Sequence, residues 1–491
     1  DMLAAADPSN MGGDKLTVLQ AMQAAVKQLE QGALGEQPLV EAGVRIAIGN
    51  TLRGLGLYDA AEPNLRRSLA LRRAALPAGH PGIADSLNFL ALLLRAQNKL
   101  AEAEPLYREA LGIRRAALPA GHPDIAHSLN NLGLLLHVEN KLAEAEPLYR
   151  ESLEIRRAAH PSGHPDVALG LHNLASLLQG QDKFAEAEAM YRESLAMRRA
   201  ALPAGHPDIA KSLNNLAWLL QVQNRPAEAE PLYREALELR RKALPAGHPD
   251  LATSLNILGL LLKAQRKFAE AEPLLRESLA IRRSALPAGH PDIATGLHNL
   301  GSLLHAQNKL AEAEPLYREA VTIDRVALPA GHPELAPGLA NLGSLLQDQN
   351  RLAEAEEFFR EALALRRSSL PEGHAETALA LSNLARVHQG LGKIAEARAE
   401  WDEAIAILRQ ASPNGSAQLA RVLWRSGSAR LENKDGGGSA AAALPQLEEA
   451  VAMAEKHLPS DHPQLGEYRE ALANCKAAIA QQAKPDANGA E

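Results

Sequence analysis

The tripeptide Gly-His-Pro recurs along the chain at a fixed interval of 42 residues. Its copies begin at Gly79, Gly121, Gly163, Gly205, Gly247, Gly289 and Gly331. One further copy, Gly373-His374, has Ala375 in place of proline. Self-similarity at a constant period of roughly 20–50 residues is the signature of a repeat array. The lattice therefore predicts a series of near-identical units, each of which contacts only its neighbours.

Each unit has the pattern of a helical hairpin. In the unit from 81 to 121, small and apolar side chains recur at helical spacing, at Ala84, Leu87, Ala91 and Leu94. The polar segment 97–99 interrupts this pattern, and a second helical pattern follows before the next Gly-His-Pro. Only 3% of the residues are aromatic, and most of the apolar residues are alanine and leucine, which favour helices. We therefore expect an all-α protein built from stacked helical hairpins.

The repeat lattice also predicts how the chain divides. Residues 1–36 are expected to form a flexible start and an N-terminal capping helix from about 15 to 31. Residues 37–415 should hold about nine units of 42 residues. Residues 416–482 read as a degenerate repeat with a Gly-rich insertion at 435–439 and a C-terminal capping helix, and residues 483–491 as a disordered tail.

The repeat resembles the tetratricopeptide pattern. Leu132-Gly133 matches its Leu-Gly pair, Ala145 the small residue that opens its second helix, and Tyr149 the aromatic within that helix. A 42-residue period, with Leu-Asn-Asn-Leu in the first helix and Ala-Glu-Pro-Leu-Tyr-Arg in the second, is similar to the long repeats of kinesin light chains and many bacterial proteins. Over about 38–415, this resemblance implies a right-handed α-solenoid whose first helices line a concave groove, and a non-catalytic scaffold that binds a peptide or partner protein.

A second resemblance concerns the start of the chain. Residues 1–8, the helix that follows and the segment 55–63 are similar to the region preceding the repeats in large bacterial membrane-anchored serine/threonine kinases. Since the chain begins at Asp1 and not at methionine, we expect a fragment or a processed product. It could be the C-terminal sensor or docking region of such a kinase or of a signalling ATPase, whose catalytic part lies upstream. End-to-end self-assembly is a third alternative, although a monomer is favoured.

Asparagines recur at one position of the first helix, just before the Leu-Gly pair. They are Asn131, Asn173, Asn215, Asn299, Asn341 and Asn383, which we call the asparagine ladder. An amide side chain both donates and accepts hydrogen bonds, so a row of amides can pair with the backbone of an extended peptide. The resemblance implies this use. The alternative is that each asparagine bonds to a neighbouring helix or loop within the array.

Other residues on the same face complete the predicted groove. The position before the ladder contributes Asn88, Asn130, Asn214 and Asn256, and positions one and two turns later contribute Trp218, Arg95, His137 and Lys263. These later positions vary while the rest of the unit does not, as expected of either a selective surface or an unconstrained solvent face. The groove is polar and mildly basic, which favours an acidic or neutral peptide with an apolar anchor near Trp218.

Several other functions are not indicated. The net charge is −7 with both signs interspersed, so no basic tract points to nucleic acid. No apolar run reaches the roughly 20 residues that span a bilayer, which favours a cytoplasmic location, or else the exposed domain of a membrane-anchored receptor. No Gly-rich phosphate loop, His-Arg-Asp or Asp-Phe-Gly motif is present, so we expect no catalytic residue and no cofactor.

The remaining chemistry-bearing residues are expected to be structural. Nine of the 17 histidines lie on the loop lattice, where repetition favours helix capping or loop packing over metal binding, and no metal site is predicted. Glu104 and Arg108 form an i,i+4 pair on a face expected to be solvated. The single cysteine, Cys475, excludes an internal disulfide and is expected to be an inert thiol.

Overall fold

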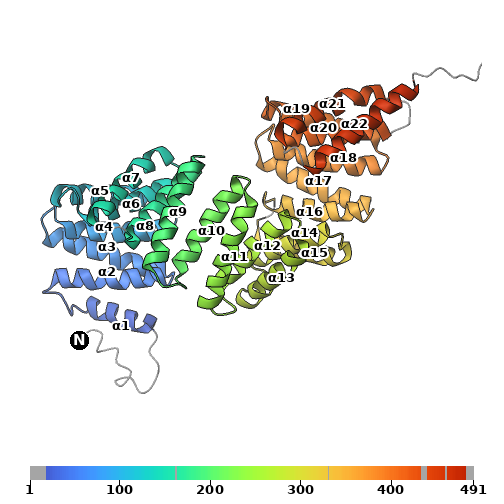
Figure 1. Ribbon diagram of the computed structural model, residues 1–491. Helices are drawn as coiled ribbons and strands as arrows, with labels where there is room; N and C mark the ends of the chain where they lie inside the picture. The colour runs from blue at the N-terminus through green and yellow to red at the C-terminus, as the bar shows by residue number, and fades with distance from the viewer. Residues whose placement is uncertain (1–17, 161–162, 330, 433–439, 459–461, 483–491) are drawn as a thin grey trace, which may run out of the picture. The chain divides into compact units, whose positions relative to one another are not determined.

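The structure is a computed structural model that describes residues 18–160, 163–329, 331–432, 440–458 and 462–482. Over these ranges it contains 22 α-helices and no strand, which confirms the all-α fold (Figure 1). The expected flexible start, the Gly-rich insertion and the C-terminal tail lie outside the described residues, as does the beginning of the predicted capping helix. The described part of that helix is α1, Val18–Glu30.

Ten consecutive hairpins follow α1, each made of a first and a second helix. The first helices are α2 (Pro38–Gly54), α4 (Pro81–Ala96), α6 (Pro123–Val138), α8 (Pro165–Gly180), α10 (Pro207–Val222), α12 (Pro249–Ala264), α14 (Pro291–Ala306), α16 (Leu335–Asp348), α18 (Ala375–Gly390) and α20 (Ala417–Glu432). The second helices are α3 (Tyr58–Ala75), α5 (Leu100–Ala117), α7 (Leu142–Ala159), α9 (Phe184–Ala201), α11 (Pro226–Ala243), α13 (Phe268–Ala285), α15 (Leu310–Ala327), α17 (Leu352–Ser369), α19 (Ile394–Ala411) and α21 (Ala440–His457). The last helix, α22 (Pro463–Gln482), packs on α21.

The chain forms two compact units, 1–243 and 244–491. Within each unit every hairpin packs on the next, as α3 does on α4 and α13 on α14. The side chains between hairpins are fully covered, with Leu87 and Leu129 both at 0% exposure. This stacking buries the apolar stripe that a lone hairpin leaves open. The domain boundaries expected at 36 and 415 remain predictions.

Close packing within a hairpin depends on the small residue of the Leu-Gly pair. At Gly133, an added Cβ would lie 3.0 Å from Cε1 of Tyr149, whose ring is buried. Gly301 meets Tyr317 at the same distance. A larger side chain at either glycine would push the aromatic ring out of the core, so the two helices would have to separate.

The turn between the two helices uses a left-handed residue. Asn98 has φ of 60°, and the amide of Lys99 donates to the carbonyl of Leu94 over 2.8 Å. This is a common way to end a helix, and asparagine tolerates the left-handed region better than most residues. Asparagine or aspartate occupies this position in most units, whereas one unit has Arg266 there, also at φ of 60°.

The loop histidines cap the first helices, as predicted. In each capped helix the imidazole Nδ1 accepts a hydrogen bond from the backbone N–H two residues later, over 3.0–3.3 Å. The residues are His80, His122, His164, His206, His248, His290, His332, His374 and His462. Nδ1 must be unprotonated to accept this bond. In α4, α6, α8, α10, α12 and α14 the Gly-His-Pro motif is therefore the helix start, with His as the N-cap and Pro as the first helical residue, whereas α16 begins two residues after its proline, at Leu335.

Glutamates at the start of the second helices join neighbouring repeats. Glu104 accepts from Arg108 in its own helix over 2.8 Å and from Lys141 in the next repeat over 3.0 Å. The i,i+4 pair is thus confirmed, and on this partly solvated face the Arg108 side chain is 50% exposed and the Glu104 side chain 20%. The same bridge recurs as Glu62–Lys99, Glu146–Lys183, Glu188–Arg225, Glu272–Lys309, Glu314–Arg351 and Glu356–Lys393.

The histidine cap can be tested at His206, whose Nδ1 accepts from the amide of Asp208 over 3.2 Å. We expect His206→Ala to destabilise the first compact unit by about 1 kcal/mol, because an amide at the start of α10 loses its acceptor. His206→Asn restores a capping oxygen and should recover most of that loss. Urea unfolding followed by circular dichroism measures both variants, and equal stability of the alanine variant and the unmodified chain would refute the capping role.

The glutamate bridges predict a specific acid sensitivity. Hydrogen bonds from Lys183 and Arg150 lower the pKa of Glu146 to about 2, against the opposing effect of partial burial. Because the folded-state pKa lies below the unfolded value, the bridge stabilises the fold above about pH 4.5, and this contribution falls away as the pH drops towards 2. Glu146→Gln should therefore cost up to about 1 kcal/mol at neutral pH and progressively less in acid.

The exposed Glu144 provides the matched control for this pH experiment. Its carboxylate lies 3.3 Å from Arg108, but the side chain is 58% exposed, so solvent weakens the interaction. Glu144→Gln should change the urea midpoint less than Glu146→Gln at pH 7, and the difference between the two variants should be smaller at pH 3. A deficit of Glu146→Gln that is the same at pH 7 and pH 3 would contradict the assigned bridge.

Candidate functional site

In each compact unit the first helices form one continuous face. The first helices of successive repeats contact each other, as α2 does with α4, α6 with α8, and α12 with α14, whereas contacts between successive second helices are sparser. The first helices therefore lie on the inner side of each stack. All of the predicted groove residues are on these helices, between α4 and α18.

The asparagine ladder is tied into the array by hydrogen bonds. Nδ2 of Asn131, Asn173 and Asn299 donates to Oδ1 of Asn88, Asn130 and Asn256, respectively, over 2.8–2.9 Å. Asn215 contacts Nε2 of His172 over 3.1 Å. Each partner belongs to the preceding repeat. One polar group of each of these four side chains therefore bonds within the array, as the alternative interpretation predicts. Each half-buried amide has a second N–H that this bond does not use, and Asn131, Asn173 and Asn299 also have an oxygen that it does not use.

The two remaining members of the ladder have other surroundings. In the repeat before Asn341, the residue at the usual partner position is His298, and its imidazole contacts the carboxylate of Asp324 over 2.9 Å. Asn383 accepts a hydrogen bond from Nη1 of Arg425 over 3.2 Å. Arg425 stands 42 residues after Asn383 and takes the ladder position in α20. Burial, and then the charges of Arg386 and Arg421, lower the pKa of Arg425 to about 9.

The position before the ladder is less accessible than expected for a binding surface. Asn130 is 7% exposed and His172 is 4% exposed, and burial lowers the pKa of His172 to about 4. Asn88, Asn214 and Asn256 are half-buried. Asn88, Asn130 and Asn256 act as acceptors for the next repeat, so their first role is to hold the ladder in register.

The later groove positions differ in exposure. Trp218 is 48% exposed, whereas Arg95, His137 and Lys263 are half-buried. Burial lowers the pKa of His137 and of Lys263, and the Lys263 ammonium contacts the hydroxyl of Ser302. Trp218 is therefore the large apolar side chain of this face that is most available to a ligand.

Tyrosines of the second helices lie directly behind the groove, which the sequence reasoning missed. His137 packs edge-on against Tyr149 with ring centroids 6.4 Å apart, and His305 packs on Tyr317 in the same way. Burial raises the pKa of Tyr107, Tyr191 and Tyr317 to about 12. The regular spacing of the tyrosines is visible in the sequence, but their contacts with the groove histidines depend on how the two helices of a hairpin pack.

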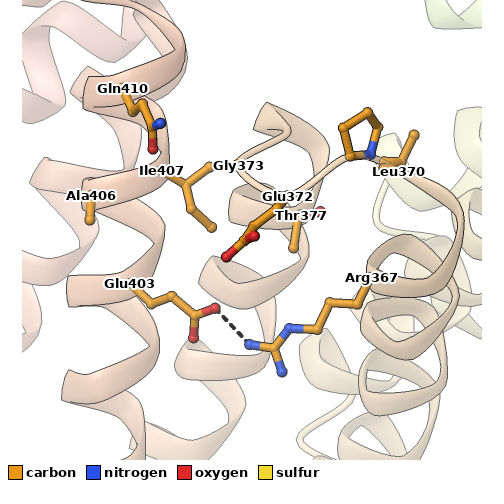
Figure 2. A pocket seen from close by; sticks show the side chains of 10 residues that line it. Arg367, Leu370, Glu372, Gly373, Thr377, Glu403, Ala406, Ile407 and Gln410 are labelled. Atoms are coloured by element: carbon orange, nitrogen blue, oxygen red, sulfur yellow. Dashed lines mark hydrogen bonds and ion pairs between the residues drawn. The ribbon is translucent and has the colours of Figure 1, made fainter.

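Two hollows outside the groove are a feature of the repeat. One of about 460 Å³ is lined by Arg367, Gly373, Glu403 and Gln410, and Arg367 donates to Glu403 over 2.7 Å (Figure 2). A hollow of about 540 Å³ has Arg283, Gly289 and Glu319 at the corresponding positions. Because the second helices repeat this arginine–glutamate bridge, the hollows follow from the stacking of loops and give no sign of a dedicated site.

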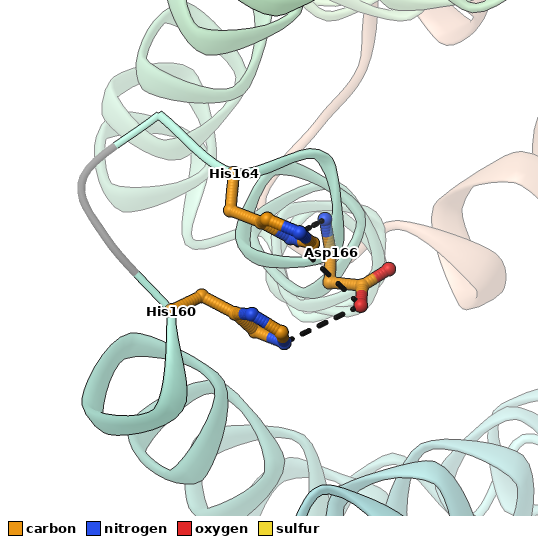
Figure 3. Close-up of side chains that lie close together, drawn as sticks. All are labelled: His160, His164 and Asp166. Atoms are coloured by element: carbon orange, nitrogen blue, oxygen red, sulfur yellow. Dashed lines mark hydrogen bonds and ion pairs between the residues drawn. The ribbon is translucent and has the colours of Figure 1, made fainter.

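One loop differs from the others by carrying a second histidine. His160 replaces the usual leucine, and its ring stacks on His164 with centroids 3.8 Å apart (Figure 3). Nε2 of His160 lies 3.5 Å from the carboxylate of Asp166. In the described part of the chain these are the three residues close enough to share a metal ion. The imidazole planes are nearly parallel, at 7°, and Nδ1 of His164 caps α8, so the observed arrangement is a stacked pair.

Cys475 lies in α22 with no exposed surface, and its Sγ contacts the carbonyl of Ala440 over 3.1 Å. Burial raises the pKa of the thiol, and the nearby Glu448 acts in the same direction. Both effects disfavour the reactive thiolate. The structure thus agrees with the expectation of an inert thiol.

This burial makes Cys475 a reporter for opening of the C-terminal hairpin. We expect the native chain to react with an aromatic disulfide reagent at least about tenfold more slowly than in 6 M urea, because the thiol is reached only when α22 detaches. Absorbance of the released thiolate measures the rate, and free cysteine at the same pH is the reference. Reaction of the native chain at the unfolded rate would show that Cys475 is accessible.

Comparison with known proteins agrees with this architecture. The sequence model of the tetratricopeptide repeat matches residues 41–116 and, in overlapping copies, 124–410, and a second model of the same repeat matches 438–464. The chain belongs to the tetratricopeptide repeat family. Such regions are generally protein–protein interaction scaffolds and are typically non-catalytic, and these matches identify no catalytic domain. Among the described residues, every helix is too short or too polar to cross a bilayer.

Individual relatives are similar over parts of the chain. Nephrocystin-3 of Xenopus laevis is 37% identical over 82 residues, which is 16% of this chain and 6% of the relative's length. The crystal structure of a Podosopora anserina protein described as a kinesin light chain with nearly identical TPR-like repeats is 24% identical, with a TM-score of 0.39, covering 43% of this chain and 99% of that one. The crystal structure of BtubC (BKLC) from P. vanneervenii is 23% identical, with a TM-score of 0.42, covering 47% of this chain and 91% of that one.

Proposed function

We propose that the face formed by the first helices binds an extended peptide segment of a partner protein, and that the asparagine ladder pairs with the peptide backbone. The proposal treats each compact unit separately, since each one carries three members of the ladder: Asn131, Asn173 and Asn215 in the first, and Asn299, Asn341 and Asn383 in the second.

The observation that carries the proposal is the internal hydrogen bond to the preceding repeat that four of the six ladder residues make, namely Asn131, Asn173, Asn215 and Asn299. The bond from Asn173 to Asn130 uses one N–H and fixes the plane of the Asn173 amide, and the half-buried side chain keeps its second N–H and its oxygen for a ligand. A fixed amide loses little conformational entropy when a peptide binds. Repetition of this geometry along the stack offers evenly spaced donors and acceptors, which suit main-chain recognition.

Residues beside the ladder supply side-chain selectivity. Trp218 offers an exposed aromatic surface next to the ladder in the first unit, and Arg95 adds a cation on the same face, whereas burial lowers the pKa of His137 and so disfavours its charged form. An acidic or neutral peptide with one large apolar residue is therefore the ligand class expected there. The sequence of a peptide that binds this face would identify the partner protein.

The pair Asn173 and Asn130 provides a direct test, because either substitution to alanine removes the same internal hydrogen bond. A peptide selected from a random displayed library would be titrated by fluorescence anisotropy. We expect Asn173→Ala to weaken binding about tenfold, since a main-chain group of the peptide loses its partner. Asn130→Ala removes a buried side chain that a ligand cannot reach, so it should change binding by less than about threefold.

Chemical changes to the peptide separate backbone recognition from side-chain recognition. N-methylation of alternate backbone amides should abolish binding in one register and spare it in the other, because only amides facing the ladder donate to it. Equal losses for Asn173→Ala and Asn130→Ala, after circular dichroism has shown that both fold, would assign the ladder a structural role. Binding unchanged in both variants would place the selected peptide elsewhere on the chain.

A further inference from the structure

An arginine near the end of the second helix reaches into the next repeat throughout most of the array. Its Nη1 donates to the backbone carbonyl of the second residue of the next first helix, as from Arg114 to Asp124 over 3.0 Å and from Arg156 to Asp166 over 2.9 Å. The same bond is made by Arg72, Arg198 and Arg282. Two of these guanidinium groups also donate to a serine of that helix, Arg114 to Ser128 and Arg198 to Ser212. Each repeat junction of this kind therefore contains a built position for a guanidinium group.

The junctions after α15 and after α19 lack this arginine, and in α19 the residue at its position is the apolar Leu408. The residue at this position in α15 is Asp324, and the serine position in α16 is Gly338. Glycine also stands at the serine position in two junctions that keep their arginine, at Gly170 and Gly296, so the change that distinguishes this junction is Asp324. A recess of about 400 Å³ lies beside it, between α14, α15 and α16. Its lining includes His298, Asn299, Asp324, Glu334, Gly338 and Asn341. Glu334 stands at the position whose carbonyl accepts the guanidinium bond in the other repeats.

The start of α16 is altered at the same place. Pro337 has no N–H, so it cannot donate to the carbonyl of Pro333, and the amide of Ala336 bonds to that carbonyl instead, over 3.1 Å. As a result α16 begins at Leu335, although its counterparts begin at the proline of the Gly-His-Pro motif. The imidazole of His298 covers Gly338 closely, since a Cβ on that glycine would lie 2.8 Å from its Cε1.

The charge in the recess is incompletely compensated. Oδ2 of Asp324 contacts Nε2 of His298 over 2.9 Å, and the two side chains are 15% and 18% exposed. Among the described residues, Nδ1 of His298 is buried without a hydrogen-bond partner, and Asp324 forms no ion pair with a lysine or an arginine. A carboxylate so withdrawn from water is costly unless a cation and further donors meet it.

We propose that this recess binds a guanidinium group supplied from outside, namely an arginine side chain of the peptide that occupies the adjacent groove. The proposal rests on the proposed function, because Asn299 and Asn341 belong both to the ladder and to the wall of the recess. A peptide that runs along the ladder of the second unit passes the mouth of the recess. At this junction the chain has Asp324 in place of its own arginine, and the arginine of the ligand binds there instead.

The chemistry of the recess favours guanidinium over other cations. A guanidinium group is planar and carries five N–H donors, so it can contact the Asp324 carboxylate and the Glu334 carbonyl at once. In the sibling junctions an arginine combines the same kinds of acceptor: Arg114 contacts the carboxylate of Asp85 over 2.7 Å as well as the Asp124 carbonyl. An ammonium group is a compact, strongly hydrated point charge, which fits such a fork less well. The ligand class is therefore an arginine-containing peptide.

The test uses a probe that lacks an extended backbone, N-acetyl-arginine amide, with N-acetyl-citrulline amide as the uncharged isostere and N-acetyl-lysine amide as the second cation. The full chain would be labelled on histidine Cε1, and the His298 signal would be assigned with His298→Gln. At constant ionic strength, the arginine probe should shift the His298 resonance in a saturable manner with a dissociation constant of roughly millimolar order. The citrulline and lysine probes should bind at least about tenfold more weakly.

Two variants locate the effect. Asp324→Arg restores the residue found at this position in the sibling repeats, so it should fold with unchanged circular dichroism, fill the recess with its own side chain and abolish the shift. Asp324→Asn keeps the shape and removes the charge, and should weaken the arginine probe at least about tenfold. Asp348→Asn removes another carboxylate of the same unit, one that lies 2.8 Å from His305 and is 50% exposed. This control should change the dissociation constant of the arginine probe by no more than about twofold.

Each outcome supports or overturns the binding of guanidinium in the recess. A shift seen only with the arginine probe and lost in both Asp324 variants supports it. Equal shifts with the citrulline probe, retained binding in Asp324→Arg, or no saturable shift in the unmodified chain overturns it. The library-selected peptide of the previous section, titrated against the same variants, keeps the two proposals apart. If that peptide binds the second unit, as shown by a loss of affinity in Asn383→Ala, and is indifferent to Asp324, the groove proposal stands and the recess proposal alone falls.

Discussion

Each hairpin in this chain has an apolar side that only another hairpin covers. Leu87 and Leu129 occupy equivalent positions in successive first helices and are both fully buried, although neither α4 nor α6 with its own second helix forms a closed core. Burial of such leucines, at about 25 cal/mol per Å² of apolar surface, stabilises the stack as a whole. The rest of the structure depends on this contact, because it forces every repeat into the same register as the one before.

Constant register means that equivalent side chains meet one repeat apart, and the polar contacts follow from this. A glutamate in one second helix faces the lysine or arginine that opens the next, as in Glu146–Lys183. An asparagine of the ladder faces the residue before the previous ladder position, as in Asn173–Asn130. These polar rows therefore hold the register of the repeats, and the proposed peptide binding would use only those groups of the ladder amides that this bond does not occupy.

Departures from the repeat mark the places where this chain can be selective. Trp218, His160 and Arg425 each replace the usual residue at a repeated position, and each has surroundings that its siblings lack. Asp324 is the departure with the largest physical consequence, because it reverses the charge at a position built for a guanidinium group and leaves a recess beside the ladder. In an array of near-identical units, a single reversal of this kind distinguishes one junction from all the others.

The helical hairpins, their period and their order can be predicted from the amino-acid sequence, because helix starts, turns and apolar spacing are local properties that each unit repeats. The His206 cap and the core positions Ala84 and Leu87 were predictable on that basis. The contacts of the polar side chains depend instead on the packing of repeats, since the partner of Asn173 or of Glu104 lies in another repeat, 43 or 37 residues away. The tertiary structure also revealed the recess at Asp324, because an absent side chain becomes a site only when three helices enclose the space that it leaves.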